Sequence, residues 1–260
     1  MVQRTKPSSR SVARPGIYRR HVRLRAEVGV VHADMEDDSH RFGVSLRHHA
    51  NRVTLVEGRA IRTPWSLCPG ALDVLHSLAG MPLVPSPLAA SEFADQKQQC
   101  THIFDLAALA ASHAARGIAS RDYRVDAPWY EIDAPRRLTL YRDDEVILEW
   151  TLQGNTIVAP EPYASIGVKS LLQWARQRPD DPDALEALFV LRRAVLISGS
   201  RTLELDALAT ADQTGHGIGA CYVHQPERIT LARRNVGSSR DFTDAPDALL
   251  ADLSAPHISQ

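Results

Sequence analysis

Three short stretches of this sequence hold histidine, cysteine and acidic side chains that could do chemistry. The first is QCTHIFDLAAL, residues 99–109, where polar side chains interrupt an alanine-rich apolar run. Because a helix turns about 100° per residue, His102 and Asp105 fall on one side and can pair. Cys100 falls in the first turn, where the helix dipole favours a thiolate. We therefore predict that Cys100, His102 and Asp105 are catalytic; the alternative is a structural His–Asp pair with Cys100 as an apolar filler.

The second stretch is HADMEDDSH, residues 32–40. In an extended chain His32 and Asp34 share one face, and after a turn Asp38 and His40 share another. Such side chains can ligate a metal or act as a general base. We predict that Asp34 or His102 acts as the base and His40 as the acid. The alternative is a solvated acidic turn between two strands.

The third stretch is AIRTPWSLCPGAL, residues 60–72. An arginine here can bind a carboxylate or phenolate, a tryptophan can stack on a flat substrate, and Cys68 begins a predicted helix. The alternative is a packed tryptophan beside a capped helix. We assign to substrate binding Arg62, Trp65, Cys68, His48 and Trp150, with Trp129 as a further pocket wall.

The pattern of apolar residues predicts an α+β fold. Short β-branched runs between Val22 and Trp65 are typical of an antiparallel meander, and a second β block has a hairpin turn at Arg142, Asp143 and Asp144. Periodic leucines and alanines predict helices over 69–79, over 99–116 with Gly117 as its stop, over 166–176 and over 182–197. This order gives antiparallel meanders packed with several helices, and it allows two similar β-then-α halves.

Length and composition predict one main domain. The chain has 260 residues, of which 44% are apolar and 23% charged, as in ordinary globular proteins. We predict a flexible basic arm at 1–20, the main domain at 21–206, and a turn-rich extension packed on it at 207–260. The absence of a long apolar run and the three widely spaced cysteines favour a soluble cytoplasmic protein with reduced thiols.

Charge and missing motifs limit the partners. With a formal net charge of −1, no overall field favours nucleic acid or an anionic membrane, and we predict neither as a partner. The sequence has no GxGxxG, P-loop, HExxH or GxSxG motif, and we predict no cofactor and no bound metal. Because an open antiparallel sheet must protect its edges, we expect a homodimer that binds a small-molecule substrate.

The segments HADMEDDSHRFGVSLRH, RTPWSLCPGALDVLHSLAGMPL and DQKQQCTHIFDLAALAASHAARG occur in this order. Together they resemble the bacterial domain-of-unknown-function family 2889 (DUF2889), over roughly residues 20–205. The resemblance implies a cofactor-poor α+β domain from bacteria that degrade aromatic, steroid or acyl compounds. It carries over Asp34, His40, Cys68, Cys100 and His102 as site residues, with Leu106 as a structural one.

These observations predict a cofactor-independent lyase that uses acid–base chemistry on a small aromatic, lignin-derived compound. Cleavage of a C–C or C–O bond, such as the loss of formaldehyde from a hydroxymethyl side chain, needs one base, one acid and an apolar pocket. One alternative is a metal-dependent enzyme with Asp34, His40, Cys100 and His102 as ligands. The other is a non-catalytic binding module for an aromatic or acyl ligand.

Overall fold

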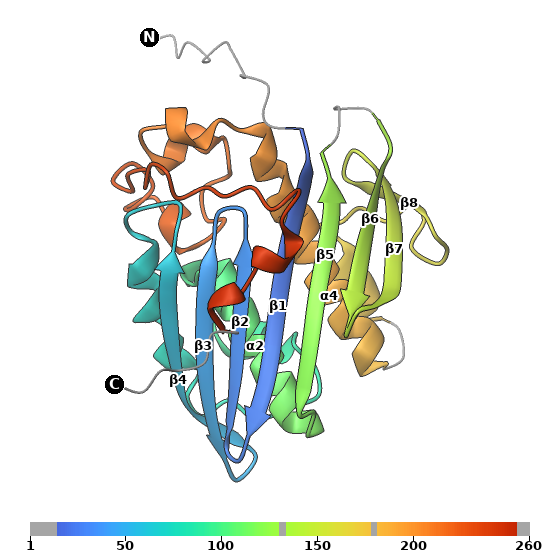
Figure 1. The fold of residues 1–260 in the computed structure, drawn as a ribbon. Coiled ribbons are helices and arrows are strands. Elements are labelled where there is room, and N and C mark those ends of the chain that lie inside the picture. The colour runs from blue at the N-terminus through green and yellow to red at the C-terminus, as the bar shows by residue number, and fades with distance from the viewer. Residues whose placement is uncertain (1–14, 130–133, 178–180, 254–260) are drawn as a thin grey trace.

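The computed structural model describes residues 15–129, 134–177 and 181–253. Its centre is one antiparallel sheet of eight strands in the order β4-β3-β2-β1-β5-β6-β7-β8 (Figure 1). The α+β prediction is therefore confirmed. The strands are β1 Ile17–Glu27, β2 Val30–Asp37, β3 Arg41–His49, β4 Arg52–Arg62, β5 Ser120–Pro128, β6 Arg136–Arg142, β7 Glu145–Gln153 and β8 Thr156–Ala159.

The sheet consists of two successive four-strand meanders. They join where β1 and β5 pair antiparallel, with Val22 opposite Tyr123. Each meander is followed by a long helix, α2 (Thr101–Arg116) after the first and α4 (Pro182–Ser198) after the second. The first strand begins at Ile17 and so overlaps the arm expected at 1–20, while residues 1–14 lie outside the described part of the chain.

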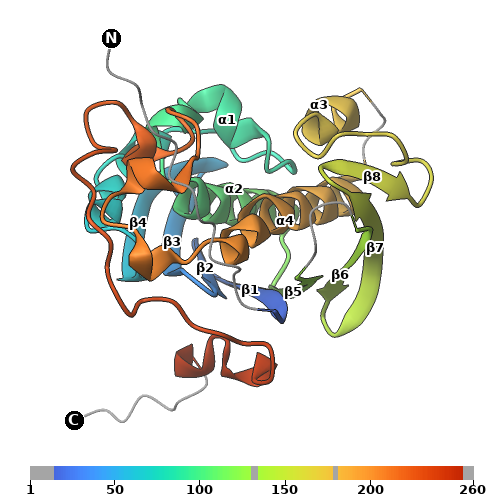
Figure 2. The ribbon, with the colours of Figure 1, turned by 90° about the horizontal axis from the view of Figure 1, so that it is seen from above.

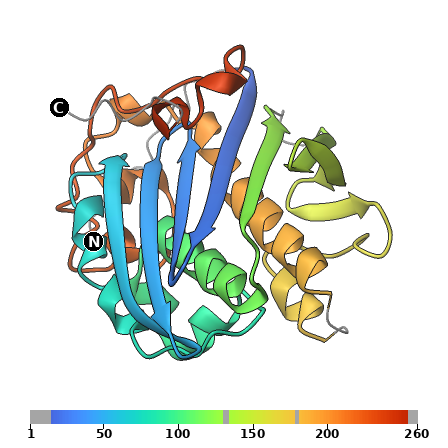
Figure 3. The same cartoon turned by 60° about the horizontal axis from the view of Figure 1, so that its bottom comes forward.

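Both long helices cover the same face of the sheet (Figures 2 and 3). Alternate residues of β2, such as Val31, Ala33 and Met35, are fully buried against this layer. The other face carries the C-terminal segment with η8 (Pro246–Ala248) and η9 (Ala251–Leu253). There the backbone N–H of Leu250 donates to the Glu36 carboxylate at 2.8 Å. The two faces of β2 are thus in different chemical environments.

Local signals set the ends of α2. Cys100 is its N-cap residue, and Gly117 ends it in the left-handed conformation with φ 64°. Its buried alanines let it lie close to the sheet. The hairpin between β6 and β7 turns at Asp143 and Asp144, which both have positive φ, while Arg142, also expected in the turn, is the last residue of β6. These two predictions are confirmed.

Other predicted helices are shorter or differently wound. The helix expected at 69–79 is two 3-10 helices, η1 (Cys68–Leu72) and η2 (Leu75–Leu78), and the helix expected at 166–176 is only α3, Leu171–Ala175. The remaining elements are α1 Ala89–Phe93, η3 Gln96–Gln98, η4 Gly199–Thr202, η5 Leu205–Ala207, η6 Ala211–Thr214 and η7 Tyr222–His224. Within the described residues, no helix has both the length and the apolar character needed to cross a membrane.

Candidate functional site

A cavity of about 380 Å³ lies where the start of α2 and the end of α4 meet η1 and the segment around η7. This size is ordinary for a small-molecule site. Its apolar wall includes Trp65, Ala71, Leu196, Ile197, Leu205 and Val223. Its polar groups include His40, Thr101, His102, Arg193, His216 and His224. All three cysteines of the chain also line it, although they are far apart in the sequence.

His40, in the turn between β2 and β3, is held by the buried carboxylate of Asp37. Its Nδ1 lies 2.9 Å from Asp37 Oδ1, which also accepts the backbone N–H groups of Ser39 and His40. The other oxygen accepts the hydroxyl of Tyr18 at 2.8 Å and lies 3.6 Å from Arg20. Burial alone would raise the pKa of Asp37, but His40 and Arg20 hold it well below its usual range. An ionised Asp37 makes Nδ1 the donor and leaves Nε2 of His40 free to accept a proton.

His102 stacks on His40, with ring centroids 3.9 Å apart and an angle of 26° between the planes. Phe42 lies beside both rings. Burial and then the neighbouring His40 lower the pKa of His102 well below its usual range, so its ring is neutral at pH 7. Its Nε2 is buried and has no hydrogen-bond partner within the described residues. The structure thus brings together His40 and His102, as predicted, but with Asp37 as their carboxylate.

Asp105 does not pair with His102. It forms an ion pair with Arg193 of α4, in which Nε contacts Oδ2 and Nη2 lies 3.2 Å from Oδ1. A guanidinium offers a carboxylate two parallel charge-assisted bonds, which a neutral imidazole cannot match. The sequence prediction was wrong because the partner comes from another helix, which the spacing within α2 cannot reveal.

Asp34 and Arg62 are also away from the cavity. Asp34 is three residues from Asp37 in β2, so its side chain lies on the opposite face of the sheet. There its carboxylate binds Arg41 at 2.8 Å and Arg59 at 3.0 Å. Arg62 binds the Glu36 carboxylate at 2.9 Å and nearby backbone oxygens. Neither the base role of Asp34 nor the ligand-binding role of Arg62 is compatible with these positions.

Of the remaining substrate-binding residues, only Trp65 and Cys68 line the cavity. His48 lies near the other end of β3, about 25 Å along the strand from His40 at the usual rise per residue. Trp150 of β7 is fully buried and packs against Tyr163, with ring centroids 5.9 Å apart. Trp129 follows β5, where its backbone N–H donates to Gly16. These three residues were assigned wrongly because an aromatic or basic residue type does not show which face or end of a strand it occupies.

Cys100 was expected in the first turn of α2 and is its N-cap residue, one position earlier, but it is not a thiolate. Burial raises its pKa to about 12, with the nearby Cys221 adding to the rise. Burial raises the pKa of Cys68 and of Cys221 as well. The removal of the sulfur from water outweighs the helix dipole. The three thiols therefore give the cavity a soft, neutral wall.

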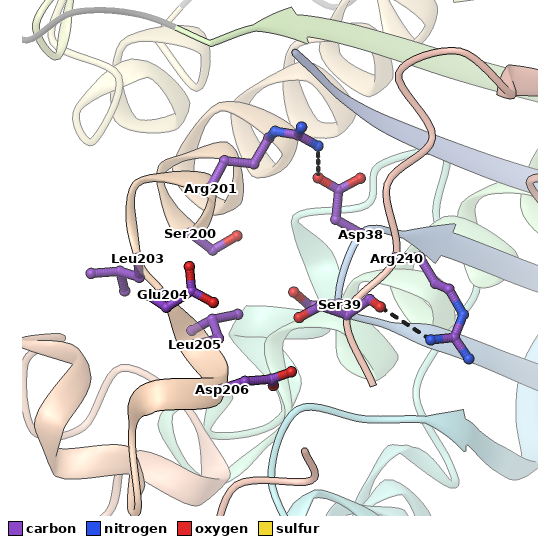
Figure 4. A pocket seen from close by; sticks show the side chains of 10 residues that line it. Asp38, Ser39, Ser200, Arg201, Leu203, Glu204, Leu205, Asp206 and Arg240 are labelled. Carbon is purple, nitrogen blue, oxygen red and sulfur yellow. Dashed lines mark hydrogen bonds and ion pairs between the residues drawn. The ribbon is translucent and has the colours of Figure 1, made fainter. Parts of the chain in front are cut away.

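A smaller hollow of about 40 Å³ lies beside the cavity, and the ion pairs of the residues that line it fix the turn that carries His40. Arg201, in η4 directly after α4, reaches Asp38 at 2.5 Å (Figure 4). It also binds Asp241 at 3.0 Å. Asp38, which was expected to share a face with His40, is thus paired with Arg201 instead. The turn is therefore fixed at two neighbouring residues, because Asp38 binds Arg201 and Asp37 accepts the hydroxyl of the buried Tyr18.

The site residues that sequence reasoning missed are Tyr18, Arg20, Asp37, Arg193, Cys221 and His224. One usable signal was present for Asp37. It continues the alternation of Val31, Ala33 and Met35, so the inward face of β2 ends in a carboxylate. The others belong to elements far away in the sequence, and nothing local marks them.

The arrangement is better suited to proton transfer than to metal binding. Asp37, His40 and His102 each offer a ligand atom, and these atoms lie within 4.8 Å of one another. However, the Asp37 carboxylate already accepts four hydrogen bonds and faces Arg20. A metal ion would have to displace several of these donors and would lie close to a guanidinium.

In comparisons with known proteins, the chain matches no protein-family model and no curated protein. The resemblance to the domain-of-unknown-function family stays a prediction. The function must therefore be inferred from the cavity and the groups around it.

Proposed function

We propose that this protein is a cofactor-independent enzyme that uses His40 for acid–base chemistry on a small aromatic compound. One observation carries the proposal: His40, oriented by the buried carboxylate of Asp37, lines a cavity with largely apolar walls. A carboxylate that is hydrogen-bonded to one ring nitrogen of a histidine fixes the tautomer of the ring and stabilises the imidazolium that forms when the other nitrogen takes a proton. An apolar cavity that excludes water strengthens such electrostatic effects.

The reaction we propose is a lyase step on a hydroxymethyl compound. Nε2 of His40 takes the hydroxyl proton, and the C–C bond breaks to release formaldehyde. The electron pair of that bond forms a C=C bond and expels an oxygen substituent from the next carbon. The imidazolium of His40 returns its proton to the departing oxygen, so that atoms and charges balance. Trp65 offers a flat apolar surface for the aromatic ring.

The same proposal includes bacterial aromatic catabolism, as the family resemblance implies, a cytoplasmic location and a homodimer. Two alternatives remain. One is a metal-dependent enzyme, since Asp37, His40 and His102 offer ligand atoms within 4.8 Å of one another. The apolar character of the cavity wall is equally compatible with a binding module for an aromatic or acyl ligand.

The test measures formaldehyde release from a panel of lignin-derived hydroxymethyl aromatics. We expect His40→Gln to lower kcat by about 10²–10⁴-fold, the usual contribution of a general base. We expect Asp37→Asn to lower kcat as well, because the amide cannot stabilise the imidazolium. The matched control is His48→Gln, a histidine of β3 outside the cavity, which should keep full activity.

Full turnover by His40→Gln would rule out the proposed base. Turnover that a chelator abolishes and a divalent ion restores would favour the metal enzyme. Saturable binding of the panel without any conversion would favour the binding module.

A further inference from the structure

Arg193 of α4 lines the cavity, and one nitrogen of its guanidinium has no hydrogen-bond partner among the described residues. Asp105 engages the Nε and Nη2 nitrogens, and no described residue bonds to Nη1. The side chain is 12% exposed and lines the cavity. Asp105 thus holds the guanidinium in one orientation, with both N–H donors of Nη1 free. A group held in this way is a preorganised site for an anionic oxygen.

The rest of the cavity supports an anion. Among the described residues, its lining includes no aspartate or glutamate, whereas Arg193 and Lys169 both contribute to it. The positive charge of Arg193 also acts on its surroundings: burial raises the pKa of Cys100 and of Cys221, and the charge of Arg193 opposes both rises.

We propose that Arg193 binds an anionic oxygen, the carboxylate or phenolate of an aromatic ligand whose ring lies against the apolar wall. This deepens the proposed function, since it names the substrate class of the same cavity. It replaces Arg62, which the structure removes from the site. Asp105 is then a positioning residue, because it acts through Arg193.

The experiment measures binding by calorimetry at pH 8 with probes that cannot react. The first pair is 4-nitrobenzoate and the neutral 4-nitrobenzamide. The second pair is 4-nitrophenolate and the neutral 4-nitroanisole. We expect one anion, or both, to bind about 10–100-fold more tightly than its neutral partner, the usual strength of a charge-assisted hydrogen bond. A preference within the first pair identifies a carboxylate, and a preference within the second identifies a phenolate.

Arg193→Gln should remove this preference while the neutral probes bind as before. The matched control is Arg192→Gln, the next arginine of α4, whose Nε bonds to the Val168 carbonyl at 3.0 Å. Arg192 does not line the cavity, so its variant should keep the preference. Because Arg193→Gln leaves Asp105 buried without its partner, the double variant Asp105→Asn/Arg193→Gln removes both charges and guards against misfolding.

Equal affinity for anion and neutral partner in the wild-type protein would overturn the proposal, and so would no binding of any probe. It would also be overturned if the Arg193 and Arg192 variants lost the preference equally. These outcomes are independent of catalysis, because none of the probes is converted. A failure of the lyase proposal would appear instead as missing formaldehyde release with the anion preference intact.

Discussion

Asp37 determines how His40 can act. Five donors surround its two oxygens, four through hydrogen bonds and Arg20 through an ion pair. A carboxylate so surrounded stays ionised despite complete burial, and it keeps one ring nitrogen of His40 as a donor. The same contacts make the protonation of Asp37 unfavourable for the folded state, which links the site to stability.

We predict that Asp37 contributes acid-sensitive stability. Although burial opposes its ionisation, His40 and Arg20 lower its pKa in the folded state below the unfolded value of about 3.9. Below pH 5 the unfolded chain therefore takes up more protons at this position, and the contribution is lost as the pH falls. Urea unfolding of wild type and Asp37→Asn between pH 3 and pH 7 measures it. The gap in unfolding free energy should shrink with falling pH; a constant gap would contradict the assignment.

The cysteines give a second prediction at the residue scale. Helix position alone would make Cys100 the most reactive thiol, but burial raises its pKa to about 12, and Cys68 is equally buried. Cys221 is less buried, and its Sγ atom lies 3.2 Å from the Nδ1 atom of His224. We expect iodoacetamide to label Cys221 first, and Cys100 and Cys68 only slowly. Mass spectrometry of labelled peptides checks the order, and faster labelling of Cys100 would restore the thiolate interpretation.

At the scale of elements, local patterns predicted what local forces determine. The end of α2 at Gly117 and the turn at Asp143 and Asp144 depend on neighbouring residues, and both were predictable. The bond of Asp105 to Arg193 depends on how α2 and α4 cross, and it was not. The candidate site combines the two kinds of information. His40 and His102 could be found in the sequence, and the alternation along β2 also marked Asp37, whereas nothing local marked Arg193.

A buried glutamate joins the elements of the second meander to α2. Glu186 of α4 is fully buried and accepts from Tyr123 at 2.6 Å, His113 at 3.0 Å, Arg116 at 3.0 Å and Arg121 at 3.1 Å. Glu186→Ala would leave these donors without their acceptor. We expect it to lower the unfolding free energy by about 3–5 kcal/mol, as measured by urea denaturation.

The control for this prediction is Glu92→Ala. Glu92 is 66% exposed and faces Arg176 at 3.4 Å, so its loss should change stability by at most about 1 kcal/mol. Similar losses in the two variants would show that the Glu186 network does not join the elements. Because Glu186 does not line the cavity, the folded variant should also bind the aromatic probes normally.

At the scale of the molecule, the sheet is open and β4 is one of its edges (Figure 3). Among the described residues, backbone groups outside the sheet bond to β4 at Val53 alone, whose N–H donates to Met81 and whose carbonyl accepts from Gly80. From 54 to 61, no described backbone group outside the sheet bonds to the strand. A free strand edge is a template for another strand. Two apolar side chains of this edge strand are exposed, Leu55 by 40% and Ile61 by 54%.

The sequence of β4 is complementary to itself around Gly58. An antiparallel pair of two copies centred there would place Glu57 opposite Arg59 and Leu55 opposite Ile61. We therefore expect a dimer in light scattering, and a monomer for Leu55→Lys/Ile61→Lys, because the new lysines would face each other across the symmetry axis. Val158→Lys at the opposite edge, 43% exposed, is the matched control and should stay dimeric. A monomeric wild type, or a double variant that remains dimeric, would show that β4 does not form the interface.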